Sequence, residues 1–134
     1  MHSVTVSTHL SASPDQVWSK IGDPGTISSW HPAIAESSLD GKDRKCTLAN
    51  GAKIDEQIDN IDDANRSYSY RIVESPLPLE DYRSTIKVVE ADGGCSVEWS
   101  ASFDVSSGPA EDTVAMIKDV YAAGLGALRE SFKS

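Results

Sequence analysis

The feature that most constrains the fold is a long central stretch, residues 33–105, in which short segments alternate apolar and polar residues. Such alternation is typical of strands with one buried face, and clusters of Gly, Pro, Asn and Asp between them favour turns. The turn signals are Asp40-Gly41, Asn50-Gly51, residues 62–65, residues 75–78 and Asp92-Gly93-Gly94. They predict six consecutive strands, over residues 34–40, 43–48, 53–61, 67–74, 81–90 and 95–105. Connections this short favour an antiparallel meander.

The segment before this stretch predicts one more strand and two helices. Residues 3–10 alternate in the same way. The Ser13-Pro14-Asp15-Gln16 motif combines an N-cap hydroxyl, a proline at the first helical position and a glutamine that reaches back to the cap. It predicts a helix that ends at Gly22. A shorter helix over residues 24–30 must end before Pro32, since the residue before a proline disfavours the helical conformation.

The carboxy-terminal segment, residues 110–133, predicts a long amphipathic helix. Its first turn is acidic and its last turn basic, as the helix dipole prefers. Its apolar residues follow spacings of three and four: Val114, Ile117, Tyr121, Leu125, Leu128 and Phe132. Gly124 and Gly126 interrupt this helix. They indicate either a close packing contact or mild bend, or clearance for a bound molecule.

Together these elements predict an α+β fold of one domain over residues 1–134, in the order strand, two helices, six strands, long helix. A seven-stranded antiparallel sheet with one polar face buries its other face by curling around the long helix. A curved sheet and a helix do not meet flush. We therefore expect a cavity of roughly 300 to 1,000 Å³ between them, the usual range for ligand sites.

Composition and charge exclude several classes of partner. The net charge is −9 and the sequence pI is about 4.6. Nucleic acids and anionic membranes need clustered basic residues, so neither is expected as a partner. No apolar run approaches the ~18 residues of a membrane span, and the first residues lack the basic and apolar regions of a signal peptide. We expect a cytoplasmic protein; its oligomeric state stays open.

Metal and redox chemistry are not expected either. Cys46 and Cys95 lack the CxxC spacing of metal or redox sites. His31 has no second histidine, cysteine or carboxylate nearby at the spacing of metal ligands. We therefore predict no metal site and no cofactor. The two cysteines are interpreted as small buried or half-buried groups, and no reactivity is assigned to them.

Several motifs resemble one known superfamily over nearly the whole chain. They are residues 11–18 (Ser-Ala-Ser-Pro-Asp-Gln-Val-Trp), Trp30-His31-Pro32, Glu56, Tyr70 ahead of residues 75–78, Tyr82, and Val97-Glu98-Trp99. The pattern is similar to the polyketide cyclase/dehydrase and lipid-transport superfamily, also called SRPBCC. This resemblance implies the START-like helix-grip fold and a hydrophobic pocket under the long helix. Because members include lipid carriers, hormone receptors and cyclases, it does not assign an activity, and no catalytic residue is assigned.

The most specific prediction for the pocket is a buried ion pair. Glu56 shares its strand face with Ile54, and Arg44 shares its face with Cys46. A two-residue turn between these strands would set their apolar faces against each other. A three-residue loop, Ala49-Asn50-Gly51 with a left-handed glycine, pairs Arg44 directly with Glu56 and keeps both apolar faces together. The pair either fixes the strand register or contacts a ligand.

Further candidates share the expected inward face. His31 either acts as an acid, base or hydrogen-bond donor toward a ligand, or only closes a loop. The loop over residues 75–79 exposes two leucines and either gates a pocket near Trp30 or is an ordinary connection. The other inward residues are either plain core or ligand contacts. The remaining candidate ligand-binding residues are Trp30, Tyr70, Tyr82, Ser84, Trp99, Tyr121 and Leu125.

Three functions fit this sequence. The first is binding or carriage of a small hydrophobic or amphipathic molecule. The second is a cyclase or dehydratase acting on an aromatic or polyketide-like substrate, with Glu56 or His31 as the base and Arg44 or a tyrosine polarising a carbonyl. The third is a protein-interaction module whose cavity has collapsed, marked by a filled core and an exposed apolar patch.

Overall fold

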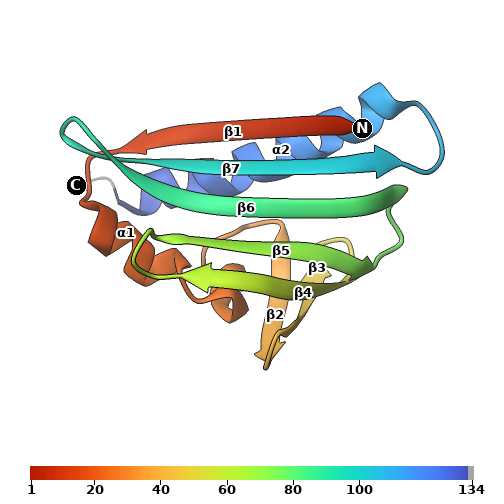
Figure 1. The fold of residues 1–134 in the computed structure, drawn as a ribbon, viewed down its shortest axis with the longest axis horizontal. Coiled ribbons are helices and arrows are strands. Elements are labelled where there is room, and N and C mark those ends of the chain that lie inside the picture. The colour runs from red at the N-terminus through yellow and green to blue at the C-terminus, as the bar shows by residue number, and fades with distance from the viewer. Residues whose placement is uncertain (133–134) are drawn as a thin grey trace.

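One antiparallel sheet of seven strands wraps around the helices of the protein (Figure 1). The structure is a computed structural model, and it describes residues 1–132. The strand order in the sheet is β1-β7-β6-β5-β4-β3-β2. The elements are β1 (His2–Leu10), α1 (Pro14–Ile21), the 3₁₀ helix η1 (Pro24–Ser29), β2 (Ile34–Asp40), β3 (Asp43–Leu48), β4 (Lys53–Asp62), β5 (Ser67–Glu74), β6 (Leu79–Ala91), β7 (Gly94–Val105) and α2 (Ala110–Ser131).

This order and topology confirm the expected helix-grip architecture, with small differences in the elements. The second helix is a 3₁₀ helix, because Asp23 caps a short Pro-Gly-Thr segment that is kinked at Thr26. β6 begins at Leu79, two residues earlier than predicted. The described part of α2 ends at Ser131, and the expected helical Lys133 lies outside the described residues.

Local sequence explains where the first helix begins and how two central strands pair. Ser13 and Gln16 form the predicted capping box at the start of α1. In the β3–β4 hairpin, Gly51 has a φ of +89° and donates its N–H to the carbonyl of Leu48. The N–H of Leu48 in turn bonds to the carbonyl of Ala52, so the three-residue loop is the one present. The predicted register between these strands is therefore confirmed.

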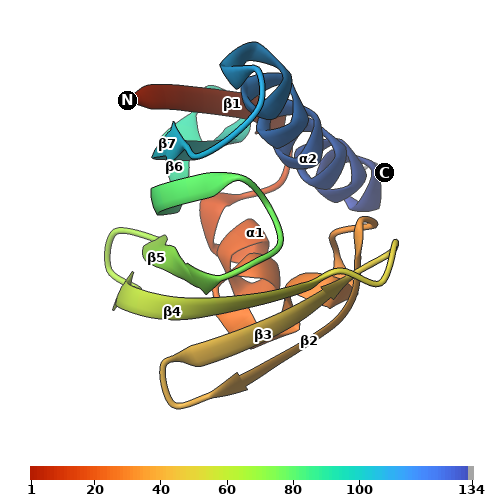
Figure 2. The same ribbon diagram turned by 90° about the vertical axis from the view of Figure 1, so that its right-hand side faces the viewer.

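The sheet is curved, and its irregularities explain the curvature. The pairing register shifts within β4 near Ile58 and within β6 between Glu80 and Arg83. Asp81, at the second shift, has a left-handed φ of +52°. Bulges of this kind bend a strand and increase its twist. Figure 2 shows the result, a sheet whose two halves face each other with α1 between them and α2 along the open side.

The core fills the concave side of the sheet. Ile117, Tyr121, Leu125 and Leu128 of α2 are buried, as the helical spacing predicts. Val114 and Phe132 are only partly buried, because the buried face of the helix also includes Thr113 and Gly124. Within residues 1–132, no helix is both long and apolar enough to cross a membrane.

Candidate functional site

A cavity of about 340 Å³ lies between the concave face of the sheet and α2. Its volume falls within the range expected from the sequence. Strands β3, β4 and β5, with single residues of β2, β6 and β7, supply one wall, and the first half of α2 supplies the other. The lining is mostly aliphatic and aromatic, and it includes two charged side chains. The lining residues are Ile27, Ala33, Ile34, Arg44, Cys46, Leu48, Ala49, Asn50, Ile54, Glu56, Tyr70, Ile72, Leu77, Tyr82, Trp99, Met116, Ile117, Val120 and Tyr121.

The two charged residues of the lining form an ion pair. Arg44 and Glu56 lie directly opposite each other in the β3–β4 ladder, as the turn chemistry predicts. Nε of Arg44 donates to Oε1 of Glu56 over 2.9 Å. The side chain of Arg44 is 1% exposed and that of Glu56 is 9% exposed. A pair this deeply buried is stable only with good geometry and further hydrogen bonds, because removing two charges from water is costly.

Arg44 finds those further contacts within the protein. Its Nη1 donates to the carbonyl of Pro24 over 3.1 Å and to the hydroxyl of Tyr68 over 3.2 Å. The guanidinium also lies 4.5 Å from the ring centroid of Tyr70 and 5.7 Å from that of Tyr68, a cation–π arrangement. Burial alone would lower the pKa of Arg44, but Tyr68 and Glu56 raise it well above its usual value. The guanidinium therefore stays charged and is enclosed by protein.

Glu56 is less completely paired. Its Oε1 accepts hydrogen bonds from Arg44 and, at 3.5 Å, from Sγ of Cys46. Its other oxygen, Oε2, accepts no hydrogen bond from a residue between 1 and 132. The side chain of Glu56 lines the cavity. Burial and the charge of Glu56 raise the pKa of Cys46 to about 12, so this thiol is protonated and unreactive at neutral pH.

A cluster of hydroxyl groups lies where β5, β6, β7 and α2 meet. Oγ of Ser84 donates to the carbonyl of Ser100 over 2.9 Å and lies 2.8 Å from the hydroxyl of Tyr121. Nε1 of Trp99 donates to Oγ of Ser84 over 3.1 Å and to the hydroxyl of Tyr70 over 3.2 Å. The hydroxyls of Tyr82 and Tyr121 are also hydrogen-bonded. The ring of Trp99 stacks on that of Tyr121 with centroids 4.1 Å apart.

Donor counting orders the protons in this cluster. Because Ser84 gives its one proton to a backbone carbonyl, Tyr121 must donate to Ser84. The proton of Tyr121 is then used, so Tyr82 must donate to Tyr121. Burial raises the pKa of Tyr82 to about 12 and the pKa values of Tyr70 and Tyr121 well above the usual value. These groups therefore remain neutral hydroxyls whose hydrogen bonds are largely made within the protein.

His31 fastens α2 to the start of β2 and does not reach the cavity. Its Nε2 donates to the carbonyl of Val120 over 2.9 Å, and its Nδ1 accepts from the N–H of Ala33 over 3.1 Å. Both ring nitrogens are used, so the ring is the neutral tautomer with its proton on Nε2. Burial lowers the pKa of His31, partly offset by the Val120 carbonyl. The ring packs against Gly124, where a Cβ atom would lie 2.5 Å from Cδ2 of His31.

Six of the ten predicted site residues line the cavity: Arg44, Glu56, Tyr70, Tyr82, Trp99 and Tyr121. The other four, Trp30, His31, Ser84 and Leu125, are buried but lie outside its lining. Trp30 packs its ring against His31 and Trp99, and its indole nitrogen has no partner within residues 1–132. Ser84 accepts from the hydroxyl of Tyr121 and from Nε1 of Trp99, and it donates to the carbonyl of Ser100. Leu125 lies one helical turn beyond Tyr121, past the end of the cavity.

Sequence reasoning missed much of the apolar lining, although the signal for it was present. Ile54 and Ile72 have the strand parity of Glu56 and Tyr70, and Met116 and Val120 flank the predicted buried face of α2. The loop before β6 also differs from expectation. Its leucines are partly buried against the core rather than exposed, and Leu77 lines the cavity.

The titratable groups of the described chain do not suggest a metal centre. No group of three or more His, Cys, Asp or Glu side chains within residues 1–132 is placed to hold a metal ion.

Comparisons with known proteins agree with this architecture. Residues 1–133 match the family model described as polyketide cyclase/dehydrase and lipid transport. The protein XoxI from Bacillus cereus superposes with a TM-score of 0.96 at 33% sequence identity, covering 98% of this chain and 96% of that one. A protein from Bacillus thuringiensis superposes with a TM-score of 0.94 at 32% identity, covering 98% of both chains.

A solved structure of much lower sequence identity shows the same fold. A START superfamily protein from Mycobacterium smegmatis superposes with a TM-score of 0.82 at 10% identity, covering 98% of this chain and 97% of that chain. Among curated proteins, no significant match is found. The family match covers nearly the whole chain and includes the segments that build the cavity. The chain therefore belongs to the polyketide cyclase/dehydrase and lipid transport family.

Proposed function

We propose that the protein binds and carries a small, mainly apolar molecule in the cavity between the sheet and α2. The observation that carries this proposal is the cavity itself, about 340 Å³ lined mostly by aliphatic and aromatic side chains. An apolar pocket with a few convergent polar groups is the usual form of a small-molecule site. Membership of a family whose fold is consistent with hydrophobic ligands supports it.

The two alternative functions have less support in the geometry. A cyclase that used His31 as its base would need that ring in the cavity, but both ring nitrogens bond to backbone groups outside it. Among the described residues, Glu56 is the one carboxylate of the cavity lining, and it is already paired with Arg44. An interaction module was expected to have a filled core, whereas this core contains a cavity.

Native mass spectrometry of freshly purified protein tests the proposal directly. We expect a bound small molecule, released on denaturation, or an apo protein that takes up added naphthalene. Quenching of tryptophan fluorescence measures the second case, because Trp99 forms part of the cavity wall. Binding of neither a cellular molecule nor naphthalene would contradict the proposal.

A matched pair of variants shows whether binding takes place in the cavity. Ala33 lines the cavity and Ala35 is exposed two residues further along. The Ala33→Phe substitution places a ring in the cavity and should abolish uptake of naphthalene. The Ala35→Phe substitution adds the same ring at the surface and should leave binding unchanged. Equal binding by both variants would contradict the proposed site.

A further inference from the structure

We infer that the cavity selects an apolar molecule that carries a neutral hydrogen-bond donor, a hydroxyl group, which donates to Oε2 of Glu56. This inference rests on the proposed function and specifies the class of ligand. Glu56 is the charged side chain of the lining with an unused acceptor: its side chain is 91% buried, since it is 9% exposed, and only Oε1 is bonded to residues of the described chain. A carboxylate oxygen that faces a mostly apolar cavity without a protein donor favours a donor supplied by the ligand.

The other polar groups of the cavity are engaged mainly within the protein, although no residue between 1 and 132 is bonded to Nη2 of Arg44. Arg44 is 1% exposed, and its Nε and Nη1 atoms are bonded to Glu56, Pro24 and Tyr68. Tyr82 and Tyr121 give their protons within the hydroxyl cluster. The side-chain oxygen of Asn50, at the β3–β4 turn, accepts from the N–H of Ala52. Oε2 of Glu56 is therefore the charged acceptor that the described residues of the lining leave for an occupant.

Charge decides which kind of donor fits. Arg44 already neutralises Glu56 at 2.9 Å, so the pair has no net charge. A carboxylate ligand would place a second anion beside Oε2 in a poorly solvated site, which repulsion disfavours. An ammonium group would place a second cation close to the guanidinium of Arg44, which is disfavoured for the same reason. A neutral hydroxyl supplies a donor without adding charge.

The volume sets the size of the apolar part. A cavity of about 340 Å³ has room for roughly 11 groups of water size, at ~30 Å³ each. A two-ring aromatic skeleton with one hydroxyl group matches this volume, whereas a long-chain lipid or a four-ring sterol exceeds it. The aromatic rings of Tyr70, Tyr82 and Trp99 in the wall suit such a flat occupant. The expected ligand is therefore a compact alcohol or phenol.

Three probes with one skeleton test the inference on the wild-type protein by calorimetric titration at pH 7. They are 2-naphthol, which donates, 2-methoxynaphthalene, which has no donor, and 2-naphthoate, which is an anion. We expect 2-naphthol to bind at least about tenfold tighter than either of the others, as a hydrogen bond to a charged group implies. Equal affinities for 2-naphthol and 2-methoxynaphthalene, or tightest binding of 2-naphthoate, would overturn the inference and leave the proposed function standing. Binding of none of the three would overturn both.

A substitution then locates the selectivity. In Glu56→Gln the amide oxygen still accepts from Arg44, while the NH₂ group replaces the free acceptor. The advantage of 2-naphthol over 2-methoxynaphthalene should fall to about threefold or less. Glu36→Gln removes the same charge from an exposed position on β2 and should keep the wild-type ratio. An unchanged ratio in a folded Glu56→Gln protein would contradict Glu56 as the acceptor. If that variant does not fold, the three-probe comparison on the wild type still decides the inference.

Discussion

At the scale of single residues, the ion pair between Arg44 and Glu56 joins turn chemistry to the cavity. The left-handed Gly51 sets the register, the register brings the two side chains together, and Pro24, Tyr68 and Tyr70 enclose the guanidinium. The sequence predicted this pairing because strand parity and loop length depend on local chemistry. It could not predict the enclosure, since Pro24 and Tyr68 come from distant parts of the chain.

The stability of this pair makes the first prediction. In Arg44→Met the carboxylate of Glu56 is left buried without its partner, so we expect a loss of about 3 to 5 kcal/mol in the free energy of unfolding. The double variant Arg44→Met with Glu56→Leu should lose much less, because no charge is left in the core. Urea denaturation measures both. Lys45→Met, at an exposed neighbour with 65% side-chain exposure, should change stability by about 0.5 kcal/mol or less. A double variant as unstable as the single one would contradict this account.

The second prediction concerns His31 and pH. Burial lowers the pKa of His31 in the folded protein below its ordinary value of about 6.5 in the unfolded chain. As the pH falls, the unfolded state therefore binds a proton to this ring before the folded state does. The stability that the neutral ring contributes is fully present above the unfolded pKa of about 6.5 and decreases as the pH falls below it. Protonated Nδ1 would also face the N–H of Ala33.

Denaturation curves of the wild type and of His31→Gln between pH 7.5 and 5 measure how much His31 contributes to the pH dependence of stability. The wild type should lose more stability across this range than His31→Gln, because carboxylates titrate equally in both. His9→Gln, at an exposed histidine of β1, should follow the wild type. Parallel pH profiles for the wild type and His31→Gln would show that the neutral ring does not contribute to the pH dependence of stability.

At the scale of elements, the two glycines of α2 have different surroundings. A Cβ at Gly124 would lie 2.5 Å from Cδ2 and 2.7 Å from Nε2 of His31, and 3.1 Å from Cζ3 of Trp99. A Cβ at Gly126 would meet nothing within 4 Å. Of the two explanations that the sequence left open for Gly124, the close packing contact is the one present. The space is needed by a histidine from the loop before β2.

These surroundings predict opposite outcomes for one chemical change. Gly126→Ala should stabilise the protein by about 0.5 to 1 kcal/mol, because alanine is the better helix former and the site is open. Gly124→Ala should instead destabilise it by about 1 to 3 kcal/mol, since α2 or the His31 ring must move. Thermal unfolding of both variants measures the difference. Stabilisation by both substitutions would show that His31 moves without cost.

The order of helices and strands could be predicted from the sequence. Which residues line the cavity could be predicted only in part. Alternation and turn residues are local signals, so strands and their register follow from them. Whether an inward side chain meets the cavity or the packed core depends on where the curved sheet and α2 separate. Trp30 and Leu125 therefore lie in the core, while Ile54 and Val120 line the cavity. Bulges at non-local positions such as Asp81 set that curvature.

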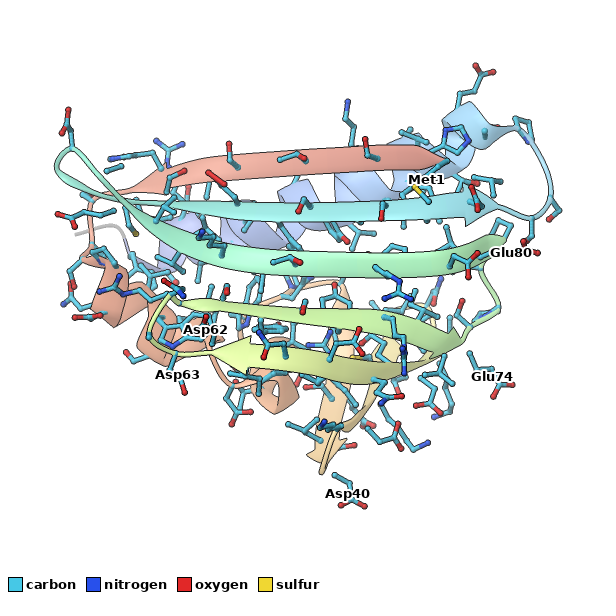
Figure 3. The ribbon with its side chains drawn as sticks, viewed as in Figure 1. Met1, Asp40, Asp62, Asp63, Glu74 and Glu80 are labelled. Atoms are coloured by element: carbon cyan, nitrogen blue, oxygen red, sulfur yellow. The ribbon has the colours of Figure 1, made fainter. Side chains whose placement is uncertain are left out.

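At the scale of the whole molecule, the acidic side chains other than that of Glu56 lie on the outer surface and the apolar lining of the cavity lies inside. The cavity holds one neutral ion pair within an apolar lining, whereas acidic residues lie on the outside at turns and near strand ends. Figure 3 shows several of them, Asp40, Asp62, Asp63, Glu74 and Glu80, away from the lining of the cavity. The net charge of −9 is therefore carried outside the cavity, whose lining holds one charge of each sign.

This separation makes the last prediction, in which a ligand stabilises the whole fold through the cavity. A molecule that binds only the folded state at 100 times its dissociation constant adds about 2.7 kcal/mol to the free energy of unfolding. For a chain of 134 residues, each kcal/mol raises Tm by about 3 to 5 °C, so 2-naphthol at that concentration should raise Tm by about 8 to 13 °C. Calorimetric melts at several ligand concentrations measure the shift, which should grow with the logarithm of concentration. The Ala35→Phe variant should show the full shift. Ala33→Phe should show none, because its added ring occupies the cavity, and an equal shift in both would place the stabilising site elsewhere on the molecule.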